Sequence, residues 1–110
     1  MTPSDFHESD FEPDLSIINN ALSVICGKWR LYIILVLGEQ TLRYTKLSEL
    51  LPGVSEKVLA GELKALVALG VMKRVLYAEI PSRVEYALTE KGIFALPQLR
   101  QIQQIGQLFT

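Results

Sequence analysis

Cysteine and histidine are scarce in this chain of 110 residues, which contains one of each. Cys26 has no second cysteine with which to form an internal disulfide, and Cys26 and His7 together cannot complete a zinc site. The sequence also shows no nucleophile next to a base and no acid-base pair in a recognisable motif, which are the arrangements that catalysis needs. We therefore expect no metal, no other cofactor and no enzymatic activity.

Long hydrophobic runs are missing as well. The longest one, from Leu31 to Leu37, is far below the roughly 18 residues that a membrane-spanning helix requires. The chain begins with acidic residues rather than with the basic start and apolar stretch of a secretory signal. The sequence therefore predicts a cytoplasmic protein that makes no contact with a membrane.

Basic residues are absent from the first 14 positions, which carry five acids: Asp5, Glu8, Asp10, Glu12 and Asp14. Subtracting these from the 12 acids of the whole chain leaves seven against 11 basic residues, so residues 15–110 carry a net charge of +4. We expect residues 1–14 to form a disordered acidic tail and residues 15–110 to form one mildly basic domain, since the chain is too short for two separate cores. A tail that competes with an anionic ligand is the alternative.

Hydrophobic spacing predicts two helices in the first part of this domain, over residues 15–25 and 28–37. The second helix is apolar nearly all round, which is typical of a helix at the centre of a core. We therefore expect Trp29 and Tyr32 to pack there rather than to bind a ligand or a base.

A very short strand over 42–44 and a short helix over 45–51 are expected next. After a turn at Pro52-Gly53, Ser55 is well placed as the N-cap of a helix over residues 56–69. The side chains expected to point inward from these two helices are Leu47, Leu50, Leu51, Leu59, Leu63 and Leu66.

Aromatic and β-branched residues over 71–77 and 83–88 predict a β-hairpin with a five-residue loop. Thr89 is expected to cap a last helix, which contains Pro97 and carries an apolar stripe. Two helices joined by a tight turn and followed by a protruding hairpin are the element order of a winged helix-turn-helix. The predicted fold class is α+β and mostly helical, with a C-terminal dimerisation helix.

The apolar stripe on the last helix is too extensive for one small domain to cover, so we expect it to pair with the first helix across a twofold axis. In a winged helix-turn-helix the second helix of the motif, here the one over residues 56–69, is the recognition helix that fits the DNA major groove. A dimer of this kind presents two hairpins and two recognition helices, which predicts an inverted-repeat DNA site. The predicted interface residues are Leu15, Ile18, Leu22, Leu96, Leu99, Ile102, Ile105 and Phe109.

Three segments of the chain resemble HxlR-type transcriptional regulators, a winged-helix family related to the MarR-like proteins. They are Gly27–Trp29 (GKW), Leu50–Leu59 (LLPGVSEKVL) and Pro81–Gly92 (PSRVEYALTEKG), and the similarity extends over residues 15–106. The resemblance implies a homodimeric DNA-binding regulator that pairs through its first and last helices. The expected function is sequence-specific binding of double-stranded DNA as a transcriptional regulator, and more narrowly as a repressor.

The chain departs from that family at its sensing position. Many members begin the matched region with a Cys-Pro pair that senses oxidants or electrophiles, whereas this chain has Ser16-Ile17. Cys26 lies at the end of a helix whose apolar face is expected in the core, which favours a buried structural cysteine. A reactive thiolate would need exposure and nearby positive charge, of which Lys28 offers only the charge. Any effector is therefore unknown.

A second departure lies in the predicted recognition helix, where related proteins carry polar or basic side chains on the face that reads bases. Lys57 and Lys64 are expected to meet phosphates or guanine, and Ala60 to touch a thymine methyl. Gly61 costs roughly 1 kcal/mol inside a helix relative to alanine, which indicates either close backbone approach to DNA or relaxed reading. Glu62 is an uncompensated acid under one hypothesis and a cytosine reader under the other.

Basic residues elsewhere extend the predicted DNA-binding surface. Arg83, beside the hairpin tip, is expected to contact phosphate or the minor groove, with Lys73 and Arg74 on the partner strand in support. The start of the helix over 45–51 is expected to hold a phosphate. The full set is Arg43, Thr45, Lys46, Ser55, Lys57, Ala60, Gly61, Lys64, Lys73, Arg74 and Arg83. The alternative function is a winged-helix protein-interaction module with weak or lost DNA reading. Glu62 and the acidic tail are the features that support this alternative.

Overall fold

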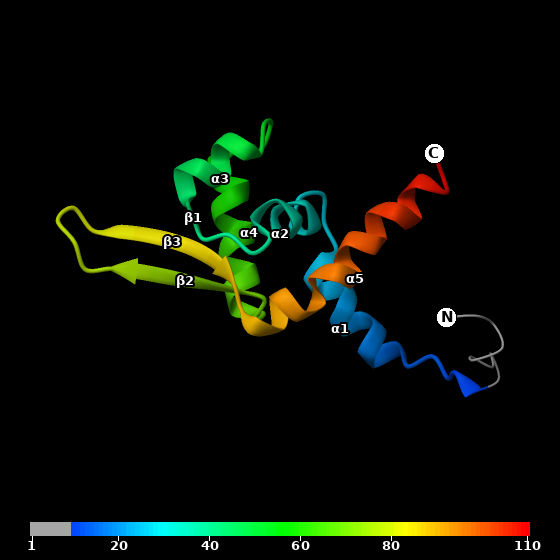
Figure 1. The fold of residues 1–110 in the computed structure, drawn as a ribbon. Helices are drawn as coiled ribbons and strands as arrows, with labels where there is room; N and C mark the ends of the chain where they lie inside the picture. The colour runs from blue at the N-terminus through cyan, green and yellow to red at the C-terminus, as the bar shows by residue number, and fades with distance from the viewer. Residues whose placement is uncertain (1–9) are drawn as a thin grey trace.

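The elements follow the order of a winged helix-turn-helix through residues 10–110, the part of the chain that this computed structural model describes (Figure 1). They are α1 (Leu15–Ile25), α2 (Arg30–Leu37), β1 (Leu42–Arg43), α3 (Tyr44–Leu50), α4 (Glu56–Ala68), β2 (Met72–Tyr77), β3 (Arg83–Leu88) and α5 (Glu90–Gln107). The predicted α+β class and element order are confirmed, with bounds that differ by one or two residues. Most of the predicted acidic tail, including His7, lies outside the described residues.

Short polar side chains fix where three of the helices begin, because each accepts a hydrogen bond from a backbone N–H group that has no partner within the helix. The cap oxygens of Asp14, Ser55 and Thr89 lie 3.1, 3.1 and 3.2 Å from the nitrogens that they accept from. The caps predicted at Ser55 and Thr89 are confirmed. Asp14 fixes the start of α1 in the same way.

Helix α2 runs through the centre of the core, as its nearly uniform apolar sequence predicts. Ile33, Ile34 and Leu37 are fully buried, and α4, the sheet and the first half of α5 pack around them. The predicted inward face of α4 is confirmed, since its buried side chains are Leu59, Leu63 and Leu66. These contacts hold α4 against the body of the domain and leave its opposite face free.

Two side chains expected in the core are exposed instead. Leu50 is 38% exposed because α3 ends there, and Leu51 points inward from the residue that follows the helix. Tyr32 is also exposed, although its ring centroid lies 6.0 Å from that of Trp29, which is partly buried against the core. One face of α2 therefore reaches the surface, which its hydrophobic pattern did not reveal.

The sheet is small and antiparallel, with β3 between β1 and β2. Strands β2 and β3 pair along their whole length, from Met72 opposite Leu88 to Tyr77 opposite Arg83. The five-residue loop expected between them is confirmed. This hairpin projects from the helices (Figure 1), and we call residues 72–88 the wing.

Gly92 fixes the junction between the wing and α5. A Cβ atom at this position would collide with the backbone carbonyl of Val71, so the residue must be glycine for α5 to pack this closely. The hydroxyl of Thr89 donates to the carbonyl of Gly70 at 2.7 Å and ties the same junction from the other side. The wing therefore leaves the core in a fixed direction.

Helix α1 and the second half of α5 extend away from the wing as two diverging arms (Figure 1). The radius of gyration is 16.6 Å, against about 13 Å for a compact domain of this length. No residue of α1 is buried. Among residues 10–110, no single helix is long and apolar enough to cross a membrane, and α1 and α2 pass that test only as a pair bent by 69°.

Candidate nucleic-acid interface

Helix α4 presents a small, polar face to solvent. Lys57, Ala60, Gly61 and Lys64 are all exposed, as their spacing predicts. A Cβ atom added at Gly61 would have no neighbour within 4 Å, so packing inside this chain does not require glycine there. The face is therefore open, and its only charged side chains at the centre are the two lysines.

A hollow of about 360 Å³ separates α4 from the sheet. It is lined by Tyr44, Ala60, Leu63, Lys64, Val67, Arg74 and Tyr86. The fold thus brings Lys64 of α4 and Arg74 of β2 to the same hollow. The hydroxyl of Tyr44 donates to the carbonyl of Glu56 at 3.1 Å, and burial raises the pKa of Tyr44.

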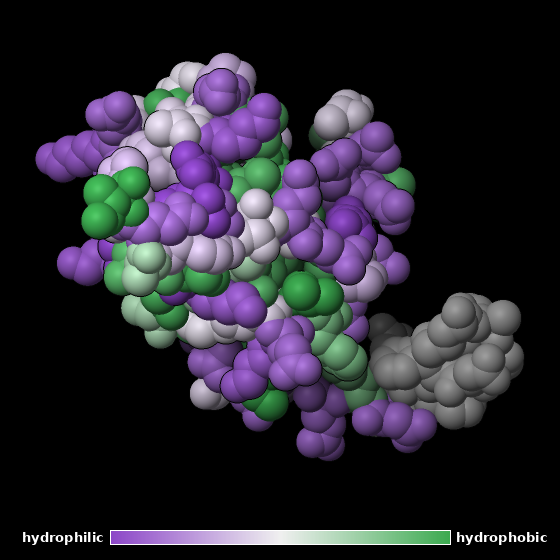
Figure 2. Space-filling view, turned by 60° about the vertical axis from the view of Figure 1, so that its left-hand side comes forward, coloured by the Kyte–Doolittle hydropathy of each residue, from purple (hydrophilic) through white to green (hydrophobic). Residues whose placement is uncertain are grey.

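A second hollow of about 500 Å³ lies between the wing tip and the start of α3. Its lining residues are Arg43, Tyr44, Thr45, Glu79, Ile80, Pro81, Ser82, Arg83 and Val84. Tyr44 lines both hollows, so the hollow at the wing tip and the hollow beside α4 are neighbours. Figure 2 turns the wing side toward the viewer and shows hydrophilic side chains interrupted by hydrophobic ones over this face. Tyr44 was absent from the predicted set because its segment reads as the end of a strand.

Arg83 is held against the wing. Its Nη1 lies 3.2 Å from Oε1 of Glu79, its Nε lies 3.2 Å from Oε2 of Glu85, and its guanidinium carbon lies 4.2 Å from the ring centroid of Tyr77. The buried Nε–H is not aligned for a hydrogen bond with any of these oxygens, so the Glu85 contact is an ion pair only. We call Tyr77, Glu79, Arg83 and Glu85 the wing clamp. Glu79 and Glu85 thus compensate the positive charge of Arg83, which the sequence predicted to contact DNA.

The other predicted basic residues differ in how free they are. Arg43 lies 3.8 Å from Glu85, which is a loose ion pair, whereas the remaining ones have no ion pair within the described residues. These unpaired basic residues are Lys46, Lys57, Lys64, Lys73 and Arg74, and all are exposed. Ser55 is occupied by its role as the cap of α4. The available positive charge therefore lies on α3, α4 and the base of the wing rather than at its tip.

Glu62 does not face the open side of α4. Its two carboxylate oxygens accept hydrogen bonds from Arg30, at 2.8 Å from Nη2 and 3.2 Å from Nε, and Nη1 of Arg30 donates to the carbonyl of Ser23 at 2.8 Å. These bonds with Glu62 raise the pKa of Arg30. The expectation that Glu62 is an uncompensated acid in the groove face is wrong. Arg30 ties α4 to the end of α1, a role that the sequence did not indicate.

The two arms carry large apolar side chains that are exposed within the part of the chain that the structure describes. On α1 these include Leu15, Ile18 and Leu22, and on α5 and just beyond they are Ile105, Leu108 and Phe109. The predicted interface needs one correction. Leu96 is 1% exposed and Leu99 is 9% exposed, so both pack into the chain's own core rather than project from an arm.

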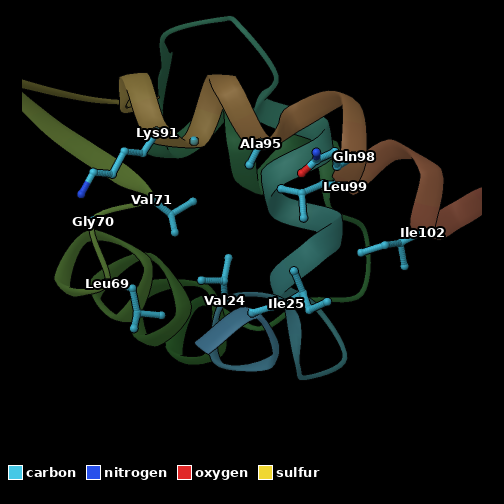
Figure 3. Close-up of a pocket in the computed structure, with 12 residues that line it drawn as sticks. Val24, Ile25, Leu69, Gly70, Val71, Lys91, Ala95, Gln98, Leu99 and Ile102 are labelled. Carbon is cyan, nitrogen blue, oxygen red and sulfur yellow. The ribbon is translucent and has the colours of Figure 1, made fainter. Parts of the chain in front are cut away.

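An apolar pocket of about 430 Å³ opens between α1 and α5 (Figure 3). Val24 and Ile25 of α1 lie across it from Ala95 and Leu99 of α5, and Val71 closes one side. Cys26 follows Ile25 and is exposed, which corrects the expectation of a buried cysteine. Among residues 10–110, no group of His, Cys, Asp and Glu side chains is placed to hold a metal ion.

A recognition helix, a wing beside it and two apolar arms define a winged-helix protein, and comparisons agree. Residues 24–110 match the family model described as HxlR-like helix-turn-helix. The HTH-type transcriptional regulator BH0655 of Halalkalibacterium halodurans is 40% identical over 86 residues, which cover 77% of this chain and 76% of that protein.

Solved structures are similar as well. A protein described as a MarR-family transcriptional regulator from Porphyromonas gingivalis has a TM-score of 0.76 at 36% identity, over 88% of this chain and 95% of that one. Diamide-treated YodB from Bacillus subtilis has a TM-score of 0.77 at 30% identity, over 89% of this chain and 97% of that one. This chain belongs to the HxlR-like helix-turn-helix family and is a transcriptional regulator, which confirms the resemblance that its sequence motifs indicated.

Proposed function

We propose that this regulator is a homodimer that binds specific sequences in double-stranded DNA and represses transcription. The observation that supports DNA binding best is the shared hollow of Lys64 on α4 and Arg74 on the wing. A helix fits the major groove, and a hairpin beside it reaches the neighbouring phosphate backbone. One duplex can therefore contact both elements at once.

The charge distribution supports the same orientation. Lys57, Lys64, Lys73 and Arg74 are exposed and have no ion pair within the described residues, so no carboxylate of residues 10–110 competes with DNA phosphates for them. We assign the phosphate contacts chiefly to these residues and to Lys46. Arg43 and Arg83, which are already paired, contribute less than their position in the sequence indicates.

The experiment is fluorescence anisotropy with a duplex from the DNA upstream of the protein's own gene, at several salt concentrations. Each phosphate contact that is removed lowers the slope of log affinity against log salt by about one, because one neutralised phosphate fewer releases its counterion. Lys64→Ala is expected to do this, and Lys91→Ala, an exposed lysine on α5, is the matched control. Unchanged affinity and slope in Lys57→Ala and Lys64→Ala would show that the face is wrongly assigned.

The dimer is supported by the exposed arms. Phe109 is 83% exposed and Leu15 is 72% exposed, and both lie on arms that extend away from the wing (Figure 1). A second copy related by a twofold axis buries these side chains and leaves both recognition helices free. With Leu96 and Leu99 excluded, the proposed interface consists of the two arms, Leu15, Ile18, Leu22, Ile102, Ile105 and Phe109.

The symmetry has a consequence for the DNA site. Two recognition helices meet successive major grooves, so the site is an inverted repeat with half-sites about one helical turn apart. A nuclease footprint that covers both half-sites, together with sedimentation as a dimer at micromolar concentration, tests this proposal. Repression follows when the bound dimer occupies promoter DNA, and a reporter gene fused to the upstream DNA measures it in the presence and absence of the protein.

Two features supported the alternative function of a protein-interaction module. One of them no longer does, because Glu62 is paired with Arg30 rather than directed at DNA. The acidic tail is the other. A wild-type protein that binds no duplex even at low salt would favour that alternative.

A further inference from the structure

The wing tip combines compensated charge with an unusual apolar exposure. Arg83, the cation nearest the loop, is engaged by Glu79, Glu85 and Tyr77. Ile80 is 103% exposed, which is more than any other large apolar side chain within residues 10–110. Pro81, which follows it, is also exposed. A surface that approaches the tip therefore meets the apolar side chains of Ile80 and Pro81 rather than a free positive charge.

Ile80 has no packing role within residues 10–110. It is not part of the core or of the side chains packed against the core. It does line the hollow between the wing tip and α3, together with Arg43 and Thr45. Ile80 therefore lies at the edge of the surface on which the DNA backbone is proposed to lie.

The wing clamp links the loop that carries Ile80 to the strands on either side of it. The ion pair between Glu79 and Arg83 spans the loop, and the N–H of Glu79 donates to the carbonyl of Tyr77 at 2.9 Å. The ring of Pro81 restricts the backbone directly after Ile80. A loop that is already ordered loses little conformational entropy when its tip enters a binding site. The charged side chains at the tip are thus engaged with one another, and Ile80 is the side chain available to contact DNA.

We propose that Ile80 is an apolar wedge that enters the DNA minor groove next to the site bound by α4. The proposal rests on the DNA-binding function proposed above. Apolar side chains at such positions contact sugars and base edges and partly unstack a base step, which bends the duplex toward the major groove. Pyrimidine–purine steps unstack most easily, so Ile80 adds a preference for such a step under the wing without any hydrogen bond to a base.

A wedge and a phosphate contact leave different signatures in a salt titration. A phosphate contact releases a counterion and changes the salt slope, whereas burial of an apolar side chain changes the affinity and leaves the slope unchanged. Ile80→Ala is expected to weaken binding about tenfold at every salt concentration, in line with the removal of most of one buried isoleucine side chain. Ile80→Leu should retain most of the affinity.

The test uses the full-length protein with the upstream duplex, in anisotropy and in gel shifts of circularly permuted fragments that report the bend. Leu76→Ala is the matched control, because Leu76 is also an exposed aliphatic side chain of the wing but belongs to β2 and not to the loop. We expect Ile80→Ala to lose affinity and bend angle with an unchanged slope, and Leu76→Ala to match the wild type. Wild-type affinity and bend in Ile80→Ala, or an equal loss in Leu76→Ala, would overturn the wedge. A wild-type protein that binds no duplex would instead refute the DNA-binding proposal itself.

Discussion

Replacing Glu62 by glutamine distinguishes between two roles for this residue, reading DNA bases and stabilising the fold. The carboxylate accepts two hydrogen bonds from Arg30, and the two side chains are 21% and 19% exposed. Glutamine keeps the size but loses the charge and one of the two acceptor oxygens. Arg30 is then left with a charge whose partner has been removed, next to the carbonyl of Ser23, to which it still donates.

The cost lies between two limits. Exposed ion pairs contribute about 0 to 1 kcal/mol, and removal of one partner of a buried pair costs about 3 to 5 kcal/mol. Because this pair is mostly covered but still reached by water, we expect Glu62→Gln to lower the free energy of unfolding by about 1 to 2 kcal/mol. For a domain of this size that corresponds to a fall in Tm of roughly 4 to 12 °C.

Thermal unfolding by circular dichroism measures the effect, at one fixed protein concentration because an oligomer's Tm depends on concentration. Arg30→Met should cost a similar amount, and the double variant should lose less than the sum of the two, which isolates the pairwise interaction. The control is Glu49→Gln, since Glu49 is exposed on α3 and has no ion pair within residues 10–110.

DNA binding provides the refutation. If Glu62 holds α4 against α1, the folded Glu62→Gln variant binds all duplexes with nearly unchanged affinity at temperatures well below its Tm. An unchanged Tm, together with a selective loss of affinity of about 1 to 3 kcal/mol at one cytosine-containing site, would refute this reasoning and restore Glu62 as a base reader.

Three further substitutions test other parts of the structure. Ile105→Asp on the exposed arm should give a monomer in sedimentation because the dimer would bury an unpaired carboxylate, whereas Phe94→Asp, on the first half of α5, should leave a dimer. Gly92→Ala should destabilise the fold by about 1 to 3 kcal/mol in denaturant titrations because its methyl group meets the Val71 carbonyl, while Gly106→Ala, where the space is open, should not destabilise it. Gly61→Ala should raise the free energy of unfolding by about 0.5 to 1 kcal/mol yet weaken DNA binding. Unchanged DNA affinity in Gly61→Ala would indicate relaxed reading instead of close backbone approach.

Local features of the chain were sufficient to predict the elements of the fold. Helix starts depend on short-range capping, so Ser55 and Thr89 could be identified from the sequence alone. The inward face of α4 depends only on the spacing of its leucines, and the wing loop on the residues between two strand-forming segments. The family motifs are contiguous in the sequence, and they were enough to indicate the regulator family.

The state of each side chain at the interface depended on partners that are distant in the sequence. Arg30 and Glu62 are 32 residues apart, and only the packing of α1, α2 and α4 brings them together. Tyr77 faces Arg83 across the wing, so strand register determines that the cation is held rather than free.

The sequence by itself determined the order of helices and strands, the caps, the core face of α4 and the family, because each follows from neighbours within a few turns of helix or from a contiguous motif. The tertiary structure alone decided that Leu96 and Leu99 lie in the core, that Cys26 and Tyr32 are exposed, and that Ile80 projects from the wing. Burial is a property of the assembled domain, and a periodic apolar stripe does not show where its cover ends. The physical reason is the geometry of α5, which packs on the core through its first half and leaves it through its second.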